Sequence, residues 1–310
     1  MNTPDAKDLL ALAADAAGAA ARLLADQGAQ SRPEVVETKS SLTDVVTEMD
    51  RRAEALITER IRAQRPGDAI LGEEGGETHG ARGAGEEPDK DPDGSPGKPG
   101  DPSAPVVRWI VDPLDGTVNY LYGLADWAVS IAAEVAGTIV AGVVAVPLHG
   151  ETFTAIRGQG SWLHSTADRA SATGEASAPG GRGAAGLRCN RDVPLGQARV
   201  GTGFGYLPGR RRVQGEVVAA LLPQIRDIRR GGSASVDLCM VAAGRLDAFY
   251  ERGLNYWDYA AGGLIAAEAG ARITGLEGRP AGTALTVAAG PGLYEELTAF
   301  LASLNPERDA

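Results

Sequence analysis

The residues best suited to chemistry lie in the segment 112–117, which reads Asp-Pro-Leu-Asp-Gly-Thr and directly follows an apolar run ending at Val111. The proline after Asp112 restricts the backbone and Gly116 permits a sharp turn, so two carboxylates can converge with the Leu114 carbonyl between them. Hard cations such as Mg²⁺ prefer oxygen ligands of this kind, completed by water and substrate phosphate. The segment therefore indicates a magnesium site, although Asp-Pro and Asp-Gly also mark ordinary surface turns.

Two further acidic segments are candidates for the same site. Glu73 belongs to a glycine-flanked acidic segment after a short apolar run, and Asp258 falls in the first turn of an expected helix. Taken alone, the first segment is more typical of a solvated turn, and Asp258 of a side chain that interacts with the helix dipole. An EF-hand is disfavoured because its ligands alternate along the chain, whereas Asp112 and Asp115 are three residues apart.

The order of these segments resembles the inositol monophosphatase family. Gly-Glu-Glu at 72–74 is followed by the segment 112–117, then by Trp-Asp-x-Ala-Ala-Gly at 257–262 and by Glu-Ala-Gly at 268–270. The resemblance covers most of the chain up to residue 275. Further segments that carry it are 37–40, 44–50, 232–234 and 250–253.

The resemblance implies a magnesium-dependent, lithium-sensitive phosphatase with two or three ions. The implied metal ligands are Glu73, Asp112 and the Leu114 carbonyl for one ion, and Asp112, Asp115 and Asp258 for a second. Thr117 and Asp50 would orient and deprotonate a metal-bound water, and Glu73 is the third implied catalytic residue. Crowded carboxylates repel one another, whereas divalent ions about 4 Å apart reverse that cost and clamp the attacking and leaving oxygens.

The implied substrate is a small phosphorylated polyol, with inositol 1-phosphate favoured. The implied substrate-binding residues are Asp115, Gly116, Thr117, Gly232, Ser233, Ala234, Glu251 and Asp258. The amides of Gly116 and Thr117 would donate to the phosphate, and Glu251 would accept hydrogen bonds from sugar-like hydroxyls. Glu251 could instead form a surface salt bridge with Arg252 or another neighbour. Lys39 is expected on a mobile loop near a third metal.

Other functions remain compatible with the same motifs. Related folds hydrolyse histidinol phosphate, fructose 1,6-bisphosphate or 3'-phosphoadenosine 5'-phosphate, and some relatives are non-catalytic partners of transcription or ribosome machinery. The intact ligand set favours an enzyme. None of the histidines, at 79, 149 and 164, lies in the motifs, which disfavours phosphohistidine chemistry. One departure from the family is Tyr120, where members often carry Phe, and this change should keep the aromatic packing.

Apolar periodicity predicts the elements that must position these residues. We expect helices at 4–27 and from about 43 to 66, strands at 69–71 and 106–111, and antiparallel strands between 127 and 162. Helices and strands should then alternate at 213–222, 225–228, 233–243, 247–250, 257–269, 285–288 and 291–304. This pattern indicates a layered α/β (α+β) protein. The resemblance implies two sheets with layered helices, in an αβαβα sandwich.

The chain is expected to form a single phosphatase unit over 1–310, with an N-terminal half at 1–165 and a C-terminal half at 188–310. In the segment 80–105, 12 of 26 residues are Gly or Pro and most others are charged or small. We expect this segment to be a disordered surface insertion because it has too few apolar residues to bury. Residues 165–187 are expected to form a loop.

The composition fits a globular protein that acts on a small ligand. At 310 residues and 43% apolar content the chain can form a substantial core. Its formal charge of −11 offers no basic field, so neither nucleic acid nor a membrane is an expected partner. Two cysteines, no signal-peptide pattern and no apolar stretch of about 18 residues favour the cytoplasm. A homodimer is expected from the resemblance alone.

Overall fold

The computed structural model describes residues 4–28, 35–38, 45–80, 107–166 and 184–309. Nearly all of the expected insertion, most of the expected loop at 165–187 and the candidate residue Lys39 lie outside these ranges. No helix within the described ranges has both the length and the apolar character that a membrane crossing requires.

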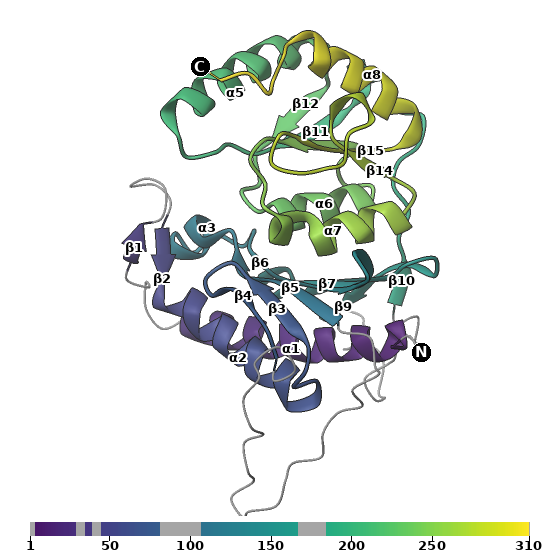
Figure 1. The fold of residues 1–310 in the computed structure, drawn as a ribbon. Coiled ribbons are helices and arrows are strands. Elements are labelled where there is room, and N and C mark those ends of the chain that lie inside the picture. Colours follow the sequence, from purple (N-terminus) through teal and green to yellow (C-terminus); the bar gives the residue numbers. More distant parts are fainter. Residues whose placement is uncertain (1–3, 29–34, 39–44, 81–106, 167–183, 310) are drawn as a thin grey trace, which may run out of the picture.

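The lower layers in Figure 1 are an eight-stranded sheet and two helices that cover its outer face. The strand order is β10-β9-β8-β7-β6-β5-β3-β4, and among the described strands of this sheet only β3 and β5 pair in parallel. The strands are β3 (Ala69–Gly72), β4 (Gly76–Thr78), β5 (Val107–Asp115), β6 (Ala128–Val135), β7 (Thr138–Val146), β8 (Glu151–Ile156), β9 (Gly160–Ser165) and β10 (Ala184–Gly186). The covering helices are α1 (Ala6–Gly28) and α2 (Glu48–Gln64).

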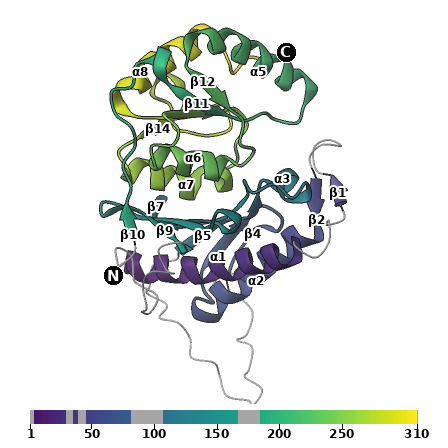
Figure 2. The same cartoon turned by 180° about the vertical axis from the view of Figure 1, so that it is seen from behind.

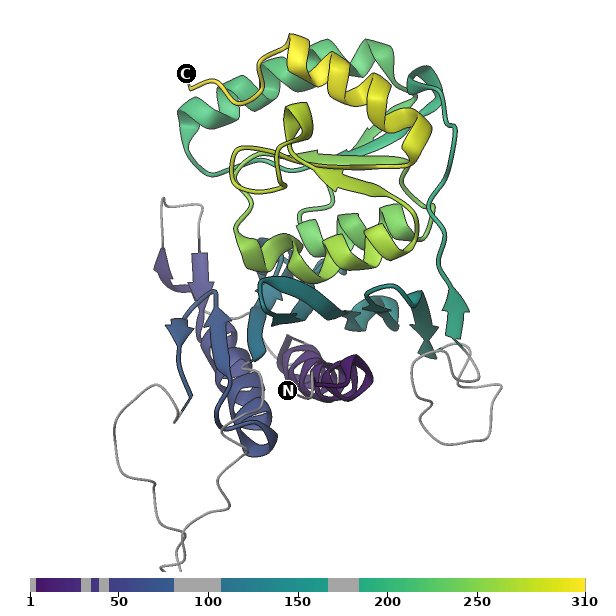
Figure 3. The same ribbon diagram turned by 45° about the vertical axis from the view of Figure 1, so that its right-hand side comes forward.

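The upper layers contain a five-stranded sheet of order β12-β11-β13-β15-β14. Its strands are β11 (Arg199–Thr202), β12 (Asp227–Arg229), β13 (Ala248–Glu251), β14 (Arg272–Thr274) and β15 (Thr286–Ala289). Helices α6 (Ala234–Ala242) and α7 (Tyr256–Glu268) lie between the two sheets, and α5 (Pro208–Leu221) and α8 (Pro291–Ser303) cover the far side (Figures 2 and 3). The predicted αβαβα sandwich is therefore confirmed.

Smaller elements complete the described fold. They are the ladder of β1 (Val35–Thr38) with β2 (Val45–Thr47), the short helix α3 (Thr117–Leu121), and 3₁₀ turns at Pro147–His149, Leu195–Gln197, Leu222–Gln224 and Leu276–Gly278. Buried apolar side chains join the layers: Leu24 and Ile57 pack beneath the large sheet, and Phe153 and Leu264 pack between the two sheets. Each such side chain contributes about 1.5–3 kcal/mol when fully buried.

Several elements differ from the sequence expectations. The second helix begins at Glu48 rather than near residue 43, because Thr47 caps it and accepts a hydrogen bond from the Met49 N–H at 3.1 Å. Strand β5 continues to Asp115, so the first four motif residues lie in a strand and not in a turn after it. The expected loop at 165–187 includes strand β10, which pairs with β9.

A bulge in β5 gives the motif its unusual shape. Asp112 pairs with Ser130 of β6, but Asp115 pairs with Ala128, so three steps along β5 oppose two along β6. Pro113 has no N–H to donate to the ladder, which suits it to such an irregularity. The bulge changes the direction in which the following side chains project, immediately before α3 begins.

Candidate active site

The parallel pairing of β3 with β5 brings Glu73 and Asp112 together. Gly72, the last residue of β3, pairs with Val111, so the next residue of each chain segment, Glu73 and Asp112, lies at the same level of the sheet, although β5 continues to Asp115. The Glu73 N–H continues the ladder by donating to the Val111 carbonyl at 3.2 Å. Two acidic segments that are distant in the sequence thus become neighbours.

Asp112 is the most enclosed carboxylate of the group. Its side chain is almost fully buried, and Oδ1 accepts a hydrogen bond from the Leu114 N–H at 3.0 Å. Burial raises the pKa of Asp112 well above its usual value, and the charges of Glu73, Asp115 and Asp258 raise it further. A hydrogen bond between the Asp112 and Glu73 carboxyl groups acts in the same direction. Positive charge at this point would relieve the mutual repulsion.

Asp115 is fixed by the first turn of α6. Its Oδ2 accepts three hydrogen bonds, from Ser233 Oγ at 2.7 Å, Ser235 Oγ at 2.6 Å and the Ser235 N–H at 2.7 Å. Burial nevertheless raises the pKa of the Asp115 carboxyl above its usual value. Ser235 was not identified from the sequence, because its contact with Asp115 joins segments that are 120 residues apart. The only local signal was its place at the start of the helix expected at 233–243.

Asp258 lies in the first turn of α7, as expected. Its Oδ2 accepts a hydrogen bond from the Asn255 N–H at 2.6 Å, and the two residues form a capping box. Burial raises the pKa of Asp258 well above its usual value, and the charges of Glu73 and Asp115 add to this. The Asp258 side chain therefore both caps α7 and belongs to the carboxylate cluster.

Thr117 and Asp50 form a hydroxyl–carboxylate pair beside this cluster. Thr117 Oγ1 lies 3.1 Å from Asp50 Oδ1 and 3.1 Å from the Leu114 carbonyl oxygen. The other oxygen of Asp50 accepts from the Thr47 N–H at 2.8 Å and from the Thr47 hydroxyl at 2.5 Å. Burial raises the pKa of Asp50 above its usual value. This geometry suits transfer of a proton from a reactant through Thr117 to Asp50.

A cavity of about 540 Å³ collects most of the predicted site residues in its wall. They are Glu73, Asp112, Leu114, Asp115, Gly116, Thr117, Gly232, Ala234, Glu251 and Asp258. Two predicted residues lie behind the wall: Ser233 is buried with its hydroxyl on Asp115, and Asp50 is buried behind Thr117. The Ser233 hydroxyl thus supports Asp115, and its predicted contact with the substrate stays a prediction.

Glu251 is a further acidic residue in the cavity wall. Burial raises the pKa of Glu251 to about 8; the Arg230 charge partly opposes this, and Asp115 adds to it. The alternative salt bridge between Glu251 and Arg252 is wrong, because Arg252 donates to Asp309 at 2.9 Å and to the Arg308 carbonyl.

The remaining sequence expectations concern residues outside the cavity wall. His149 pairs with Asp126 at 3.2 Å, and His164 lies 3.1 Å from the Thr154 hydroxyl. The Tyr120 ring packs edge-on against Trp127, and its hydroxyl donates to a backbone carbonyl in α1, so the aromatic packing expected at this position is confirmed.

The donor set fits a hard divalent cation by its chemistry. Within the described residues, no three His, Cys, Asp or Glu side chains lie close enough together to define a metal centre by geometry alone. Three carboxylates raise the pKa of Asp112, and every candidate ligand is an oxygen. A bound cation would replace the repulsion among these carboxylates by attraction.

The chain as a whole is similar to known proteins. The model of the inositol monophosphatase family matches residues 5–308. Inositol-1-monophosphatase SuhB of Mycobacterium tuberculosis is 44% identical over 274 residues, which span 87% of this chain and 82% of that protein. Nus factor SuhB of Escherichia coli strain K12 is 35% identical over 272 residues, spanning 87% of this chain and 86% of that protein.

Solved structures show the same relationship. The Mycobacterium tuberculosis SuhB structure superimposes with a TM-score of 0.73 and 38% identity, covering 99% of this chain and 100% of that one. An inositol monophosphatase from Thermotoga maritima also gives a TM-score of 0.73, with 27% identity and coverage of 96% and 98%. The layered fold and the order of its elements are therefore shared.

Proposed function

Because this chain belongs to the inositol monophosphatase family and is a phosphoric monoester hydrolase, we propose that it uses Mg²⁺ to hydrolyse inositol 1-phosphate to myo-inositol and phosphate. The observation that carries this proposal is that Glu73, Asp112, Asp115 and Asp258 line one cavity, where the charges of the other three oppose ionisation of Asp112. Such a cluster suits cations that in turn bind a phosphate.

We propose two principal metal positions that share Asp112. Glu73 and the Leu114 carbonyl would complete the first, and Asp115 and Asp258 the second. When bound, the ions supply positive charge to the phosphate and make water more acidic. Hydrogen bonds within the protein fix two of the proposed ligands: Asp115 accepts from the start of α6, and Asp258 accepts from the Asn255 N–H. Outer partners of this kind orient metal ligands and tune their basicity.

Proton removal from the attacking water is assigned to Thr117 and Asp50. The water oxygen attacks phosphorus while the bond from phosphorus to the alcohol oxygen breaks. The leaving alkoxide takes up a proton from solvent, to which Asp50 returns the proton that it received. Thr117 accepts the proton of the water as it passes its own to Asp50, 3.1 Å away. The two Thr47 donors hold Asp50 in the orientation that this transfer needs.

Substrate recognition is assigned to the remaining cavity wall. The amides of Gly116 and Thr117 would donate to phosphate oxygens, and Gly232 and Ala234 would face the alcohol. Glu251, with a pKa of about 8, is mostly protonated at neutral pH, so it can donate one hydrogen bond to a ring hydroxyl and accept another. This pattern suits a polyol better than an apolar leaving group.

A phosphate-release panel tests the proposal. Purified protein with Mg²⁺ is compared on inositol 1-phosphate, histidinol phosphate, fructose 1,6-bisphosphate and 3'-phosphoadenosine 5'-phosphate, with EDTA as the control. We expect kcat/KM to be highest for inositol 1-phosphate and release to stop in EDTA. A higher kcat/KM on another of the four substrates would replace the inositol assignment, whereas activity that persists in EDTA would contradict the metal mechanism.

A second candidate function is a regulatory role in transcription. The observation in its favour is the similarity to a protein named Nus factor SuhB. The formal charge of −11 disfavours direct RNA contact, so we propose a protein surface as the partner in that case. Folded, Mg²⁺-loaded protein that releases phosphate from none of the four substrates would favour this role over the enzymatic one.

A further inference from the structure

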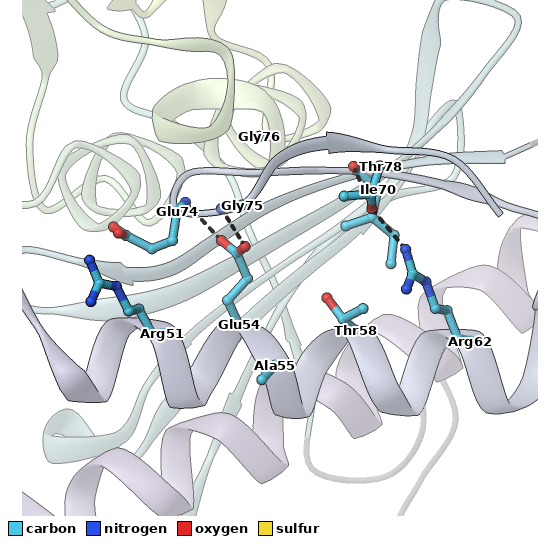
Figure 4. Close-up of a pocket in the computed structure, with 10 residues that line it drawn as sticks. All are labelled: Arg51, Glu54, Ala55, Thr58, Arg62, Ile70, Glu74, Gly75, Gly76 and Thr78. Carbon is cyan, nitrogen blue, oxygen red and sulfur yellow. Dashed lines mark hydrogen bonds between the residues drawn. The ribbon is translucent and has the colours of Figure 1, made fainter.

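A second cavity, of about 380 Å³, lies between α2 and the turn that follows β3 (Figure 4). Glu54 projects from α2 across this cavity toward the turn. Its two carboxylate oxygens accept hydrogen bonds from two successive backbone amides, Glu74 N–H at 2.9 Å and Gly75 N–H at 2.7 Å. These amides directly follow Glu73, so Glu54 binds the backbone of the segment that carries a proposed metal ligand.

Gly72 and Gly75, on either side of the acidic pair, leave the space that the Glu54 carboxylate occupies. A Cβ atom at Gly72 would lie 2.5 Å from Glu54 Cδ, and one at Gly75 would lie 2.6 Å from Glu54 Oε1. Neither glycine has a positive φ, so another residue could adopt either backbone conformation. The Gly-Glu-Glu-Gly pattern is therefore explained by the space that Glu54 occupies and not by backbone geometry.

We propose that Glu54 is a positioning residue that aims the Glu73 carboxylate into the active-site cavity. The Glu73 backbone is held from two sides: its own N–H donates to Val111 of β5, and the next two N–H groups donate to Glu54 of α2. Hydrogen bonds to a carboxylate are roughly twice as strong as neutral ones. The inference rests on the proposed function, because it takes Glu73 as a metal ligand.

The same helix positions the proton acceptor. Asp50 lies four residues before Glu54, so the two side chains occupy the same face of α2, one turn apart. Asp50 contacts Thr117 in the active site, while Glu54 contacts the Glu73 turn. A single rigid element thereby sets the position of the general base relative to the metal-ligand turn.

Glu54→Ala and Glu54→Gln test this role, with Glu59→Gln as the matched control on the exposed side of α2. The readouts are Mg²⁺ affinity by calorimetry, the melting temperature in EDTA and with Mg²⁺, and kcat and KM for inositol 1-phosphate. We expect Glu54→Ala to weaken Mg²⁺ binding about 10- to 100-fold, a typical loss for a partner that orients a ligand. Glu54→Gln keeps one acceptor, so its Mg²⁺ affinity should lie between those of Glu54→Ala and the wild type. Glu59→Gln should bind Mg²⁺ as tightly as the wild type.

The outcomes separate the two proposals. If Glu54→Ala reaches most of the wild-type kcat at saturating Mg²⁺, this result would support a positioning role, because the bound ion restores the ligand geometry. Wild-type Mg²⁺ affinity in Glu54→Ala would overturn the inference while leaving the proposed function intact. A wild-type protein that binds no Mg²⁺ would overturn the proposed function, and the inference with it.

Gly75→Ala provides an independent test that keeps Glu54. The added Cβ displaces the Glu54 carboxylate from the exposed turn, so Mg²⁺ affinity should fall as in Glu54→Ala without loss of the fold. In the Glu54→Ala background the same change should have little further effect, since the clashing group is gone. Gly215→Ala, with no atom within 4 Å of its Cβ, is the control. Additive losses in the double variant would contradict the proposal.

Discussion

Asp112 is the residue on which the repulsion within the carboxylate cluster converges. Its burial and its three acidic neighbours all oppose ionisation. Asp112→Asn keeps the size of the side chain but removes the charge that both proposed metal positions share. We expect Mg²⁺-dependent phosphate release to fall more than about 1,000-fold, which corresponds to about 4 kcal/mol of lost transition-state stabilisation.

The fold should survive this substitution. An amide in place of a carboxyl that resists ionisation removes repulsion, so the melting temperature in EDTA should equal or exceed that of the wild type. Phosphate release and thermal unfolding are measured on the same preparation. Retained activity in a folded Asp112→Asn protein would contradict the assignment of the metal site.

The raised pKa of Glu251 should make the free energy of unfolding depend on pH. Its pKa is about 8 in the folded protein against 4.5 for an ordinary Glu, so the folded state holds a proton that the unfolded state has lost. The free energy of unfolding of the metal-free protein should therefore fall as the pH rises from about 4.5 to about 8. Glu251→Gln cannot ionise and should lose less stability over this window. Urea unfolding in EDTA checks this, and identical pH profiles for both proteins would argue against it.

At the scale of elements, the long amphipathic helices and the motif segments could be predicted from the sequence, because their periodicity and residue order are local. Strands β4, β10 and β14 have three residues each and carry no usable pattern, since they form only by pairing with neighbours. Glu54 and Ser235 were missed for a related reason. Their contacts with the site join residues 20 and 120 positions apart and leave no spacing to recognise.

Asp68 anchors the junction between α2 and the paired strands β3 and β5. Its buried carboxylate accepts from Trp109 Nε1 at 2.9 Å and from the Val107 N–H at 3.3 Å, and it also binds Arg65. Asp68→Ala leaves the buried indole N–H without its acceptor, so the free energy of unfolding should fall by about 2–3 kcal/mol.

Urea unfolding measures this loss against a matched surface change. Asp15→Ala removes an exposed carboxylate that pairs with Arg60, and such pairs contribute about 0–1 kcal/mol. Equal losses in the Asp68 and Asp15 variants would show that Asp68 does not anchor the junction.

At the scale of the whole molecule, the active site is assembled across the layers. Asp112 lies in strand β5 of the large sheet and Glu73 in the turn after β3, whereas Ser235 and Asp258 come from the two helices packed above the sheet. The distances among the carboxylates therefore depend on how closely α6, α7 and the sheet pack. Neither half of the chain supplies all of the proposed metal ligands.

Two neighbouring glycines of α7 test this dependence. A Cβ at Gly262 would lie 3.0 Å from Leu238 Cβ of α6, closer than most real contacts, whereas a Cβ at Gly263 would lie an ordinary 3.8 Å from Ile273. Alanine favours a helix over glycine by about 0.5–1 kcal/mol at both positions. Gly263→Ala should therefore be neutral or stabilising, while overpacking should make Gly262→Ala less stable than Gly263→Ala by at least about 1 kcal/mol.

The Gly262→Ala and Gly263→Ala variants also test whether helix packing controls the geometry of the site. Gly262→Ala pushes α7 away from α6, and these helices carry Asp258 and the serines that hold Asp115. Its Mg²⁺ affinity should fall together with its free energy of unfolding, and Gly263→Ala should keep wild-type affinity; calorimetry and urea unfolding measure the two quantities. Wild-type affinity in a destabilised Gly262→Ala protein would mean that the ligands adjust independently of the helices, and that the interlayer spacing does not set the geometry of the site.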